Sequence, residues 1–375
     1  MTQRTTRKPQ NTRNRQISAG SPGSALYVVV PGDLDTRTGG YGYDRRIIAG
    51  LRDRGWTVRV LRLDDTFPTP TPAARHHAAQ VLASIPDGST VLVDGLALGA
   101  LPEEVEREAP RLRMVALVHH PLAAETGIDP ALAAALAVSE RRALAAVRSV
   151  VVTSPATAAR LGEYGVNHDR IAVIEPGTDP APPARGFVVD DEPSDVSLLC
   201  VATLTPRKGH ALLLHALASI PERNWHLTCA GSVDRDPATV SHLQEQIRDA
   251  GLDDRVSLVG DLDQSALAVQ YHRADVFVLA TLYEGYGMAV AEALARGLPV
   301  ISTATGAIQD LVGDGGLVVS PGDLPGFTAA LSAVIGDPVR RAALRARACS
   351  RRGRLPTWTA AAAAMAKALA SPGGG

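Results

Sequence analysis

The sequence predicts an α/β protein made of two doubly wound domains, each a parallel sheet covered by helices. Short apolar runs alternate with helical stretches from residue 25 onward, which is the pattern of successive βαβ units. A proline- and charge-rich segment, residues 180–194, interrupts this alternation, which starts again at Val196. With 375 residues, of which 45% are hydrophobic, the chain can build two cores. We therefore expect four parts: a basic tail (1–24), a first domain (25–185), a second domain (186–355) and a closing segment (356–375).

The composition argues against several classes of partner and location. A net charge of −1 argues against nucleic acid as a partner. No apolar run reaches the roughly 20 residues that span a bilayer, and no secretory signal is visible. The three cysteines are scattered without a CxxC pair, so we expect a cytoplasmic protein. The preference for Arg over Lys is associated with GC-rich bacterial sources.

The amino-terminal tail, residues 1–24, is polar and basic, which is typical of a disordered segment. Its charge leaves two alternatives open, peripheral contact with a membrane and an RNA-binding arm. No apolar face accompanies the charge, so we favour disorder.

The first domain begins with a βαβ unit whose glycines are placed to meet a ligand. The strand Ala25–Val30 precedes Thr38-Gly39-Gly40-Tyr41-Gly42-Tyr43, which we interpret as a glycine loop followed by a helix from Asp44 to Arg54. Ligands of such sheets bind at the carboxyl ends of the strands, and Gly39, Gly40 and Gly42 would let one approach the backbone. A plain tight turn explains these glycines about as well, with Asp44 as an N-cap. Further strands are expected at 56–63, 91–93, 114–118, 150–152 and 171–174, and a loop at 67–75.

Two adjacent histidines, His119 and His120, follow the strand 114–118 directly. Imidazole titrates near neutral pH and can donate a hydrogen bond to a hydroxyl or a phosphate. The spacing does not choose between the two, and a role in packing the loop is the alternative. Zinc binding is disfavoured because neighbouring residues converge poorly on one ion and no third ligand has motif spacing.

The second domain repeats the α/β pattern and carries a pair of cations after its first strand, Val196–Val201. Arg207 and Lys208 lie between this strand end and the next helix, where an arginine fork and a lysine point charge could meet a diphosphate. A solvated surface pair is the alternative. Further strands are expected at 225–230, 256–259, 276–280 and 316–319.

The most informative stretch is Leu282–Val300, with the sequence LYEGYGMAVAEALARGLPV. A buried strand precedes it, and a helix should open near Met288 and close at Gly297. Glu284 lies in the loop and Glu292 lies in the second helical turn. The free amides at the helix start can bind phosphate, so the two carboxylates and the amides suit a ligand with hydroxyls at both ends and phosphates between. Alternatively, Glu292 only pairs with Arg296 one helical turn later.

These residues resemble family 4 of the retaining glycosyltransferases, which have the GT-B fold. Glu284 and Glu292 match the family's E-x7-E motif, and Pro206-Arg207-Lys208-Gly209 matches its diphosphate clamp. The family often has a functional histidine where His119 and His120 stand. The chain departs from the family at Thr203 and Ala202, where many members have an arginine. Trp358 and the Ala-rich stretch after it resemble the last GT-B helix, which crosses back to the first domain.

The resemblance implies a metal-independent transfer of a sugar from a nucleoside diphosphate sugar to a hydroxyl or other nucleophile, with retention of the anomeric configuration. It implies no cofactor, a small-molecule, lipid or glycan acceptor, and no metal ligand. The implied catalytic residues are His119, His120, Arg207, Lys208 and Glu284. The implied donor-binding residues are Gly39, Gly40, Gly42, Thr203, Arg207, Lys208, Gly260, Asp261, Glu284, Gly285, Tyr286, Gly287, Met288 and Glu292.

Three alternatives on the same fold deserve comparison with this interpretation. A phosphorylase needs a lysine for pyridoxal phosphate, and only Lys8, Lys208 and Lys367 exist. A sugar-nucleotide epimerase and a homologue that binds sugar nucleotides without transferring them stay open. Asp-x-Asp triplets, which hold a metal in another glycosyltransferase fold, occur here in turn-like segments where Asp is common, so we do not expect a metal there.

Overall fold

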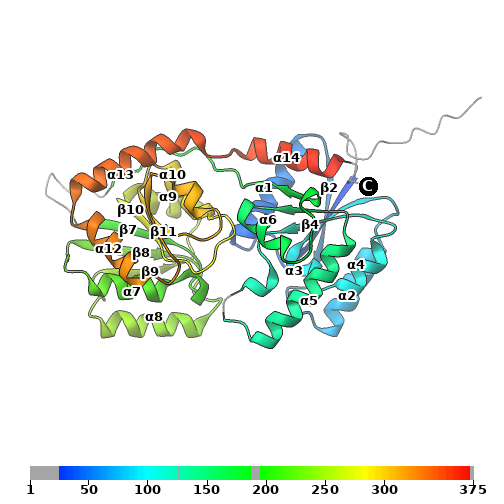
Figure 1. Cartoon of the computed structure of the whole chain (residues 1–375), viewed down its shortest axis with the longest axis horizontal. Coiled ribbons are helices and arrows are strands. Elements are labelled where there is room, and N and C mark those ends of the chain that lie inside the picture. Colours follow the sequence, from blue (N-terminus) through cyan, green and yellow to red (C-terminus); the bar gives the residue numbers. More distant parts are fainter. Residues whose placement is uncertain (1–24, 126, 187–194, 372–375) are drawn as a thin grey trace, which may run out of the picture.

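The structure, a computed structural model, describes residues 25–125, 127–186 and 195–371. The predicted basic tail, residues 187–194 of the predicted linker and residues 372–375 lie outside the described residues. Two α/β domains lie side by side along the long axis of the molecule (Figure 1). Each contains one six-stranded sheet in which all strand pairs are parallel, as the alternating runs predict.

The sheet of the first domain has the strand order β2-β1-β3-β4-β5-β6. Its strands are β1 (Ala25–Pro31), β2 (Thr57–Leu63), β3 (Thr90–Asp94), β4 (Arg113–Val118), β5 (Ser149–Val152) and β6 (Ile171–Val173). Its helices are α1 (Gly39–Asp53), α2 (Pro72–Ala83), α3 (Gly95–Leu98), α4 (Pro102–Glu108), α5 (Pro130–Ala146) and α6 (Pro155–Gly162), with short 3-10 turns η1 (Leu122–Ala124) and η2 (His168–Arg170). The order reverses between β1 and β3, and ligands of such sheets bind beside the carboxyl ends of the strands at this point.

The sheet of the second domain has the order β12-β11-β10-β7-β8-β9, which reverses at β7 and β10. Its strands are β7 (Val196–Val201), β8 (Trp225–Ala230), β9 (Val256–Gly260), β10 (Val276–Leu279), β11 (Val300–Thr303) and β12 (Gly316–Val319). Its helices are α7 (His210–Ser219), α8 (Pro237–Asp249), α9 (Gln264–Arg273), α10 (Met288–Ala295), α11 (Ile308–Val312), α12 (Leu324–Ile335) and α13 (Pro338–Arg351), with 3-10 turns η3 (Pro206–Lys208) and η4 (Arg352–Arg354).

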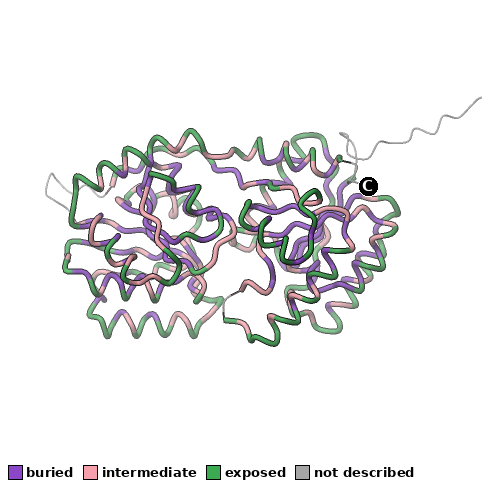
Figure 2. The backbone as a smooth tube through the Cα atoms, in the orientation of Figure 1, coloured by how far each residue is buried: buried purple, intermediate pink, exposed green. Residues whose placement is uncertain are grey.

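Buried strands form the centre of each domain, and exposed residues lie mainly on the outer helices (Figure 2). The last helix, α14 (Trp358–Ala370), follows α13 and packs on the first domain beside α1 (Figure 1). Its Ala361, Met365 and Leu369 belong to the same core cluster as Ile47 and Leu51 of α1. Among the described residues, no helix combines the length and the hydropathy that a membrane crossing requires.

Three local predictions differ from the structure. The glycine segment is not a loop, because α1 already begins at Gly39 and the Thr38 side chain, not Asp44, accepts the hydrogen bond that caps it. Part of the predicted loop 67–75 is helical, because Thr71 caps α2 and Pro72 occupies its first turn. The short strand β11 was not predicted, since four residues after Pro299 look like the end of the preceding helix signal.

The helices α7 and α10 differ from the other long helices in how their amino-terminal ends are capped. Among described α-helices of eight residues or more, the rest have a side-chain cap, from Thr38, Thr71, Asp129, Ser154, Asp236, Asp263, Asp323, Asp337 or Thr357. Helices α7 and α10 instead begin after Gly209 and Gly287, two left-handed glycines that provide no cap. Their first amides therefore lack a side-chain acceptor, and both helices start at the switch point of the second sheet.

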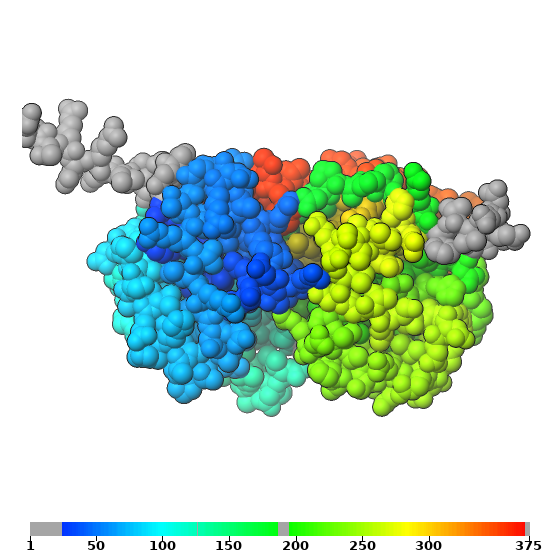
Figure 3. Space-filling view, turned by 180° about the vertical axis from the view of Figure 1, so that it is seen from behind, coloured from blue at the N-terminus to red at the C-terminus, as the bar shows by residue number. Residues whose placement is uncertain are grey.

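The two domains touch along a narrow junction (Figure 3). The loop after β1 reaches the second domain, where Arg37 pairs with Asp261 at 3.4 Å and both side chains are about half exposed. Met288 lies against α1, since a Cβ on Gly39 or Gly42 would lie 3.9 or 3.8 Å from its side chain. The candidate site lies where these elements meet.

Candidate functional site

The carboxyl ends of the two sheets face each other at the junction. A Cβ on Gly285, in the loop after β10, would lie 2.6 Å from the carbonyl oxygen of His119, at the end of β4. Any side chain at position 285 would therefore force the two domains apart. The close approach explains a glycine here and joins the residues predicted from the two halves in one site.

The two predicted cations, Arg207 and Lys208, each contact a carboxylate. Lys208 Nζ lies 2.5 Å from Glu284 Oε2, and both side chains are mostly buried. Arg207 Nε lies 2.9 Å from Glu125 Oε1 and reaches the first domain across the junction. Burial alone would raise the pKa of Glu284, but Lys208 and Arg207 more than offset it and the pKa is lowered. The site thus has two neighbouring cations, each paired with a carboxylate. A diphosphate that binds these cations would have to compete with both carboxylates.

Three glycines hold the backbone around these cations. Gly209 has φ +69°, and a Cβ there would lie 2.0 Å from the Ala280 carbonyl oxygen. Gly287 has φ +98° and turns the chain into α10. Gly306, which sequence reasoning missed, has φ +55° and would place a Cβ 1.9 Å from the carbonyl oxygen of Glu284. The loop with Glu284 and Gly285 is therefore supported from behind by a second loop that only glycine can form.

Glu292 points into the second domain beside Tyr271. The Tyr271 hydroxyl donates to Glu292 Oε2 at 3.0 Å, and the Arg296 guanidinium stacks over the tyrosine ring at 4.3 Å. Burial raises the pKa of Glu292, partly countered by that hydrogen bond and by the charge of Arg296. Arg296 donates to the backbone carbonyl of Glu292. Tyr271 leaves one carboxylate oxygen for a ligand and fixes the other, a role that no sequence signal indicated.

The structure separates the two histidines. Nε2 of His119 lies 3.2 Å from Asp44 Oδ1 and 3.8 Å from Asp94 Oδ2. Nε2 of His120 lies instead 3.5 Å from Glu125 Oε2, and its ring lies beside Tyr283. His119 therefore belongs to the first-domain side of the junction, and His120 belongs to the group around Arg207. Sequence reasoning placed Asp44 only as a helix cap and gave Asp94 no role.

The remaining predicted positions surround this centre. Gly39, Gly40 and Gly42 form the first turn of α1, next to Met288 and His119. Thr203 follows β7, and Gly260 ends β9 with φ +72° before the exposed Asp261. Tyr286 is buried, and its hydroxyl has no partner among the described residues.

The Asp-x-Asp triplets have identifiable roles in local structure. Asp33 accepts from the amide of Asp35 in a turn, Asp236 and Asp263 cap α8 and α9, and Asp261 pairs with Arg37.

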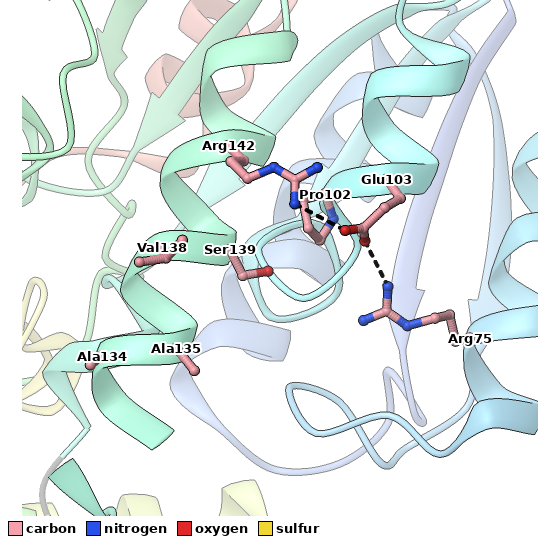
Figure 4. A pocket seen from close by; sticks show the side chains of 8 residues that line it. All are labelled: Arg75, Pro102, Glu103, Ala134, Ala135, Val138, Ser139 and Arg142. Atoms are coloured by element: carbon pink, nitrogen blue, oxygen red, sulfur yellow. Dashed lines mark hydrogen bonds and ion pairs between the residues drawn. The ribbon is translucent and has the colours of Figure 1, made fainter. Parts of the chain in front are cut away.

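A groove elsewhere on the first domain is lined by α2, α4 and α5 (Figure 4). Glu103 lies between Arg75 and Arg142, 3.0 Å from each, so these charges satisfy one another. None of its lining residues belongs to the group at the junction.

Comparison with known proteins gives two family matches that lie in different domains. The family model described as "Glycosyl transferases group 1" matches residues 195–337, and the one described as "Glycosyltransferase Family 4" matches residues 95–182. The first match contains Arg207, Lys208, Glu284 and Glu292, and the second contains both histidines.

Proteins with similar sequences are also named glycosyltransferases. A D-inositol 3-phosphate glycosyltransferase of Xylanimonas cellulosilytica is 33% identical over 61% of this chain and 58% of its own length. An MMP alpha-(1->4)-mannosyltransferase of Mycolicibacterium hassiacum is 26% identical over 72% of this chain and 68% of its own length. The chain spans about three fifths of the length of the curated relatives it matches.

Solved structures share the whole architecture. Sucrose-phosphate synthase from Thermosynechococcus elongatus superposes with a TM-score of 0.76 at 21% identity and covers 92% of this chain and 98% of its own. Anabaena HepE in complex with UDP and glucose superposes with a TM-score of 0.73 at 16% identity, covering 92% of this chain and 99% of its own. At these identities the likeness concerns the GT-B fold, which agrees with the two sheets described above.

Proposed function

This chain belongs to the family 4, or group 1, glycosyltransferases, and from that premise we propose that it transfers a sugar from a nucleoside diphosphate sugar to a hydroxyl or other nucleophile, without a metal ion and with retention of the anomeric configuration. The observation that carries the proposal is that Arg207 and Lys208 lie beside two helix starts without a side-chain cap, those of α7 and α10. Positive charge and amides without side-chain acceptors lie at one switch point, where a diphosphate needs both.

The second domain accounts for each part of such a donor. The free carboxylate oxygen of Glu292 is suited to the ribose hydroxyls, and the diphosphate would lie between the start of α10 and the two cations. Glu284 would then meet hydroxyls of the transferred sugar. The base would rest near Gly260 and Asp261, where contacts through backbone atoms leave no side-chain signature of which base is bound. The name of HepE states a complex with UDP and glucose, which supports this class of donor by fold alone.

The chemistry then depends mainly on charge. The bond between the sugar carbon and the leaving phosphate breaks, and a new bond to the acceptor oxygen forms on the same face. The acceptor proton moves to a leaving phosphate oxygen, and Arg207 and Lys208 stabilise the charge that grows there. No carboxylate nucleophile enters this scheme. The acceptor, a small molecule, lipid or glycan, would approach from the first domain.

The test is a thermal-shift screen of uridine, guanosine, adenosine and thymidine diphosphates and their sugars, followed by transfer assays with the stabilising donor. We expect one nucleoside diphosphate to raise the melting temperature and its sugar to be transferred or hydrolysed, with a product of the donor's anomeric configuration by NMR. EDTA should leave the rate nearly unchanged.

Other outcomes separate the alternatives. Binding without transfer or hydrolysis would indicate a non-catalytic homologue, and conversion of one sugar nucleotide into another would indicate an epimerase. Inverted product would contradict the retaining scheme, and loss of activity in EDTA that manganese restores would contradict metal independence.

A further inference from the structure

The first-domain side of the junction contains a buried group of two carboxyl groups and one imidazole. Asp44 comes from α1, Asp94 from the end of β3 and His119 from the end of β4. Both aspartates are 2% exposed, and the three polar atoms lie within 4.8 Å of one another. Asp44 Oδ2 has no hydrogen-bond partner among the described residues. Two buried carboxylates this close are unfavourable unless one of them is protonated or a positive charge lies beside them.

The ring of His119 is held in one orientation. Its Nε2 faces both carboxylates, at 3.2 Å from Asp44 and 3.8 Å from Asp94. The Tyr43 ring meets it edge-on at 5.5 Å, and a Cβ on Gly40 would lie 3.3 Å from its Cδ2. The ring therefore lies against the first turn of α1, and Nδ1 is the nitrogen left to meet a ligand.

The charges around the ring favour its protonated form. Burial alone would lower the pKa of His119, but Asp44 and Asp94 more than offset it and the pKa is raised. The pKa of Asp94 is raised to about 7 by burial and by the charge of Asp44. Farther out, burial and the charges of Asp94, Asp44 and Asp65 raise the pKa of the neighbouring Tyr41 hydroxyl, and the charge of Arg235 partly offsets this. The two groups nearest to the imidazole are thus the carboxyl groups of Asp44 and Asp94.

We propose that Asp44 and Asp94 are positioning residues that hold His119 as a fixed imidazolium beside the first turn of α1, where it binds the donor's phosphate from the first domain. The proposal rests on the nucleotide-sugar function above and adds a third cation to Arg207 and Lys208. Its charge differs from theirs because it depends on two buried acids. The first amides of α1 and the imidazolium would together attract an anion at the end of the sheet.

The test compares nucleoside diphosphate binding across pH in the wild type and in Asp44→Asn, Asp94→Asn and the double variant. The nucleoside diphosphate that stabilises the wild type in the thermal-shift screen is titrated calorimetrically from pH 6.5 to 9 and is used throughout. A terminal phosphate with a pKa of about 6 is essentially ionised over the upper part of this range. In both proteins we expect the affinity for the nucleoside diphosphate to fall about tenfold as the His119 ring loses its proton. In the double variant this fall should come at a pH at least about one unit lower than in the wild type, because its ring deprotonates earlier.

Two controls make the result specific. Asp65→Asn removes an exposed carboxylate after β2, at the same edge of the sheet, and should leave the pH profile unchanged. The nucleoside without phosphate should bind with no pH step in any variant. Coincident profiles for the wild type and the double variant would overturn the proposal.

A second measurement does not depend on the folding of the aspartate variants. The imidazole signal of His119 is assigned by NMR from its loss in His119→Gln, and its titration is followed in the unliganded wild type. A ring still charged at pH 7 supports the proposal, and a neutral ring there overturns it. If no nucleoside diphosphate binds the wild type at all, the proposed function fails, while this titration still decides whether the two acids keep His119 charged.

Discussion

We infer that the two sides of the domain junction, called here the first-domain wall and the second-domain wall, supply positive charge in different ways. The second-domain wall uses Arg207 and Lys208, each paired with a carboxylate, beside helix starts that glycines leave uncapped. The first-domain wall has His119, whose charge, in the proposal above, depends on Asp44 and Asp94 beside it. Under the two proposals above, anion binding by the second domain does not depend on buried acids, whereas anion binding by the first domain responds to pH. Variants on each wall should therefore fail differently.

The largest effect is expected at Lys208. Lys208→Ala should lower kcat/KM by about 10²–10³-fold, because a preorganised cation facing the leaving group is lost. Steady-state rates with the donor from the screen give the measurement, and a melting curve checks folding, since Glu284 loses its partner. Lys367→Ala, an exposed lysine on α14, is the matched control. Wild-type turnover in Lys208→Ala would show that the second wall does not act on the leaving group.

The next effect concerns Glu292 and affects binding more than rate. Glu292→Gln should weaken nucleoside diphosphate affinity by about 1.5–3 kcal/mol, because a buried contact to the ribose is lost. Tyr271→Phe should cost less, since it only frees the oxygen that Tyr271 holds. Isothermal titration measures both, with Glu245→Gln on the exposed face of α8 as control. An unchanged dissociation constant in Glu292→Gln would show that this carboxylate does not bind the ribose.

A smaller effect of opposite sign is expected where the two walls touch. Glu125→Gln removes the carboxylate that pairs with Arg207 across the junction, so the diphosphate no longer competes with it. Donor affinity should rise by about two- to fivefold, the range of a partly exposed ion pair. The gain should shrink at high salt, because screening weakens both interactions. Weaker donor binding would mean that Glu125 instead positions Arg207 for the donor.

The smallest effect is expected at the rim. Arg37 and Asp261 pair across the domains at 3.4 Å with both side chains about half exposed. Arg37→Ala should change donor affinity by no more than about fivefold and leave the melting temperature nearly unchanged. Small-angle scattering with and without donor would show whether the pair helps to keep the domains close. A large loss of affinity would make this loop part of the donor site.

Local sequence patterns determined most of the fold. Alternating apolar runs predicted two parallel sheets because strands buried on both faces read as short hydrophobic blocks. Pro206-Arg207-Lys208-Gly209 and the spacing of Glu284 and Glu292 located the second wall, since each motif lies within a single strand–loop–helix unit. Residues that contact one another within such a unit are close in sequence, so a single segment contains the whole motif.

Only the tertiary structure decided the first wall and the supports of the second. Asp44 and His119 are 75 positions apart, and Tyr271 meets Glu292 from another helix, so no local pattern records either pair. Gly306 is required only because the backbone of Glu284 lies against it. Likewise, α1 begins at Gly39, before any apolar periodicity appears, because Thr38 caps its first turn. Close approaches between distant segments depend on how the sheets and helices pack, and packing is a property of the folded chain that no single stretch of sequence carries.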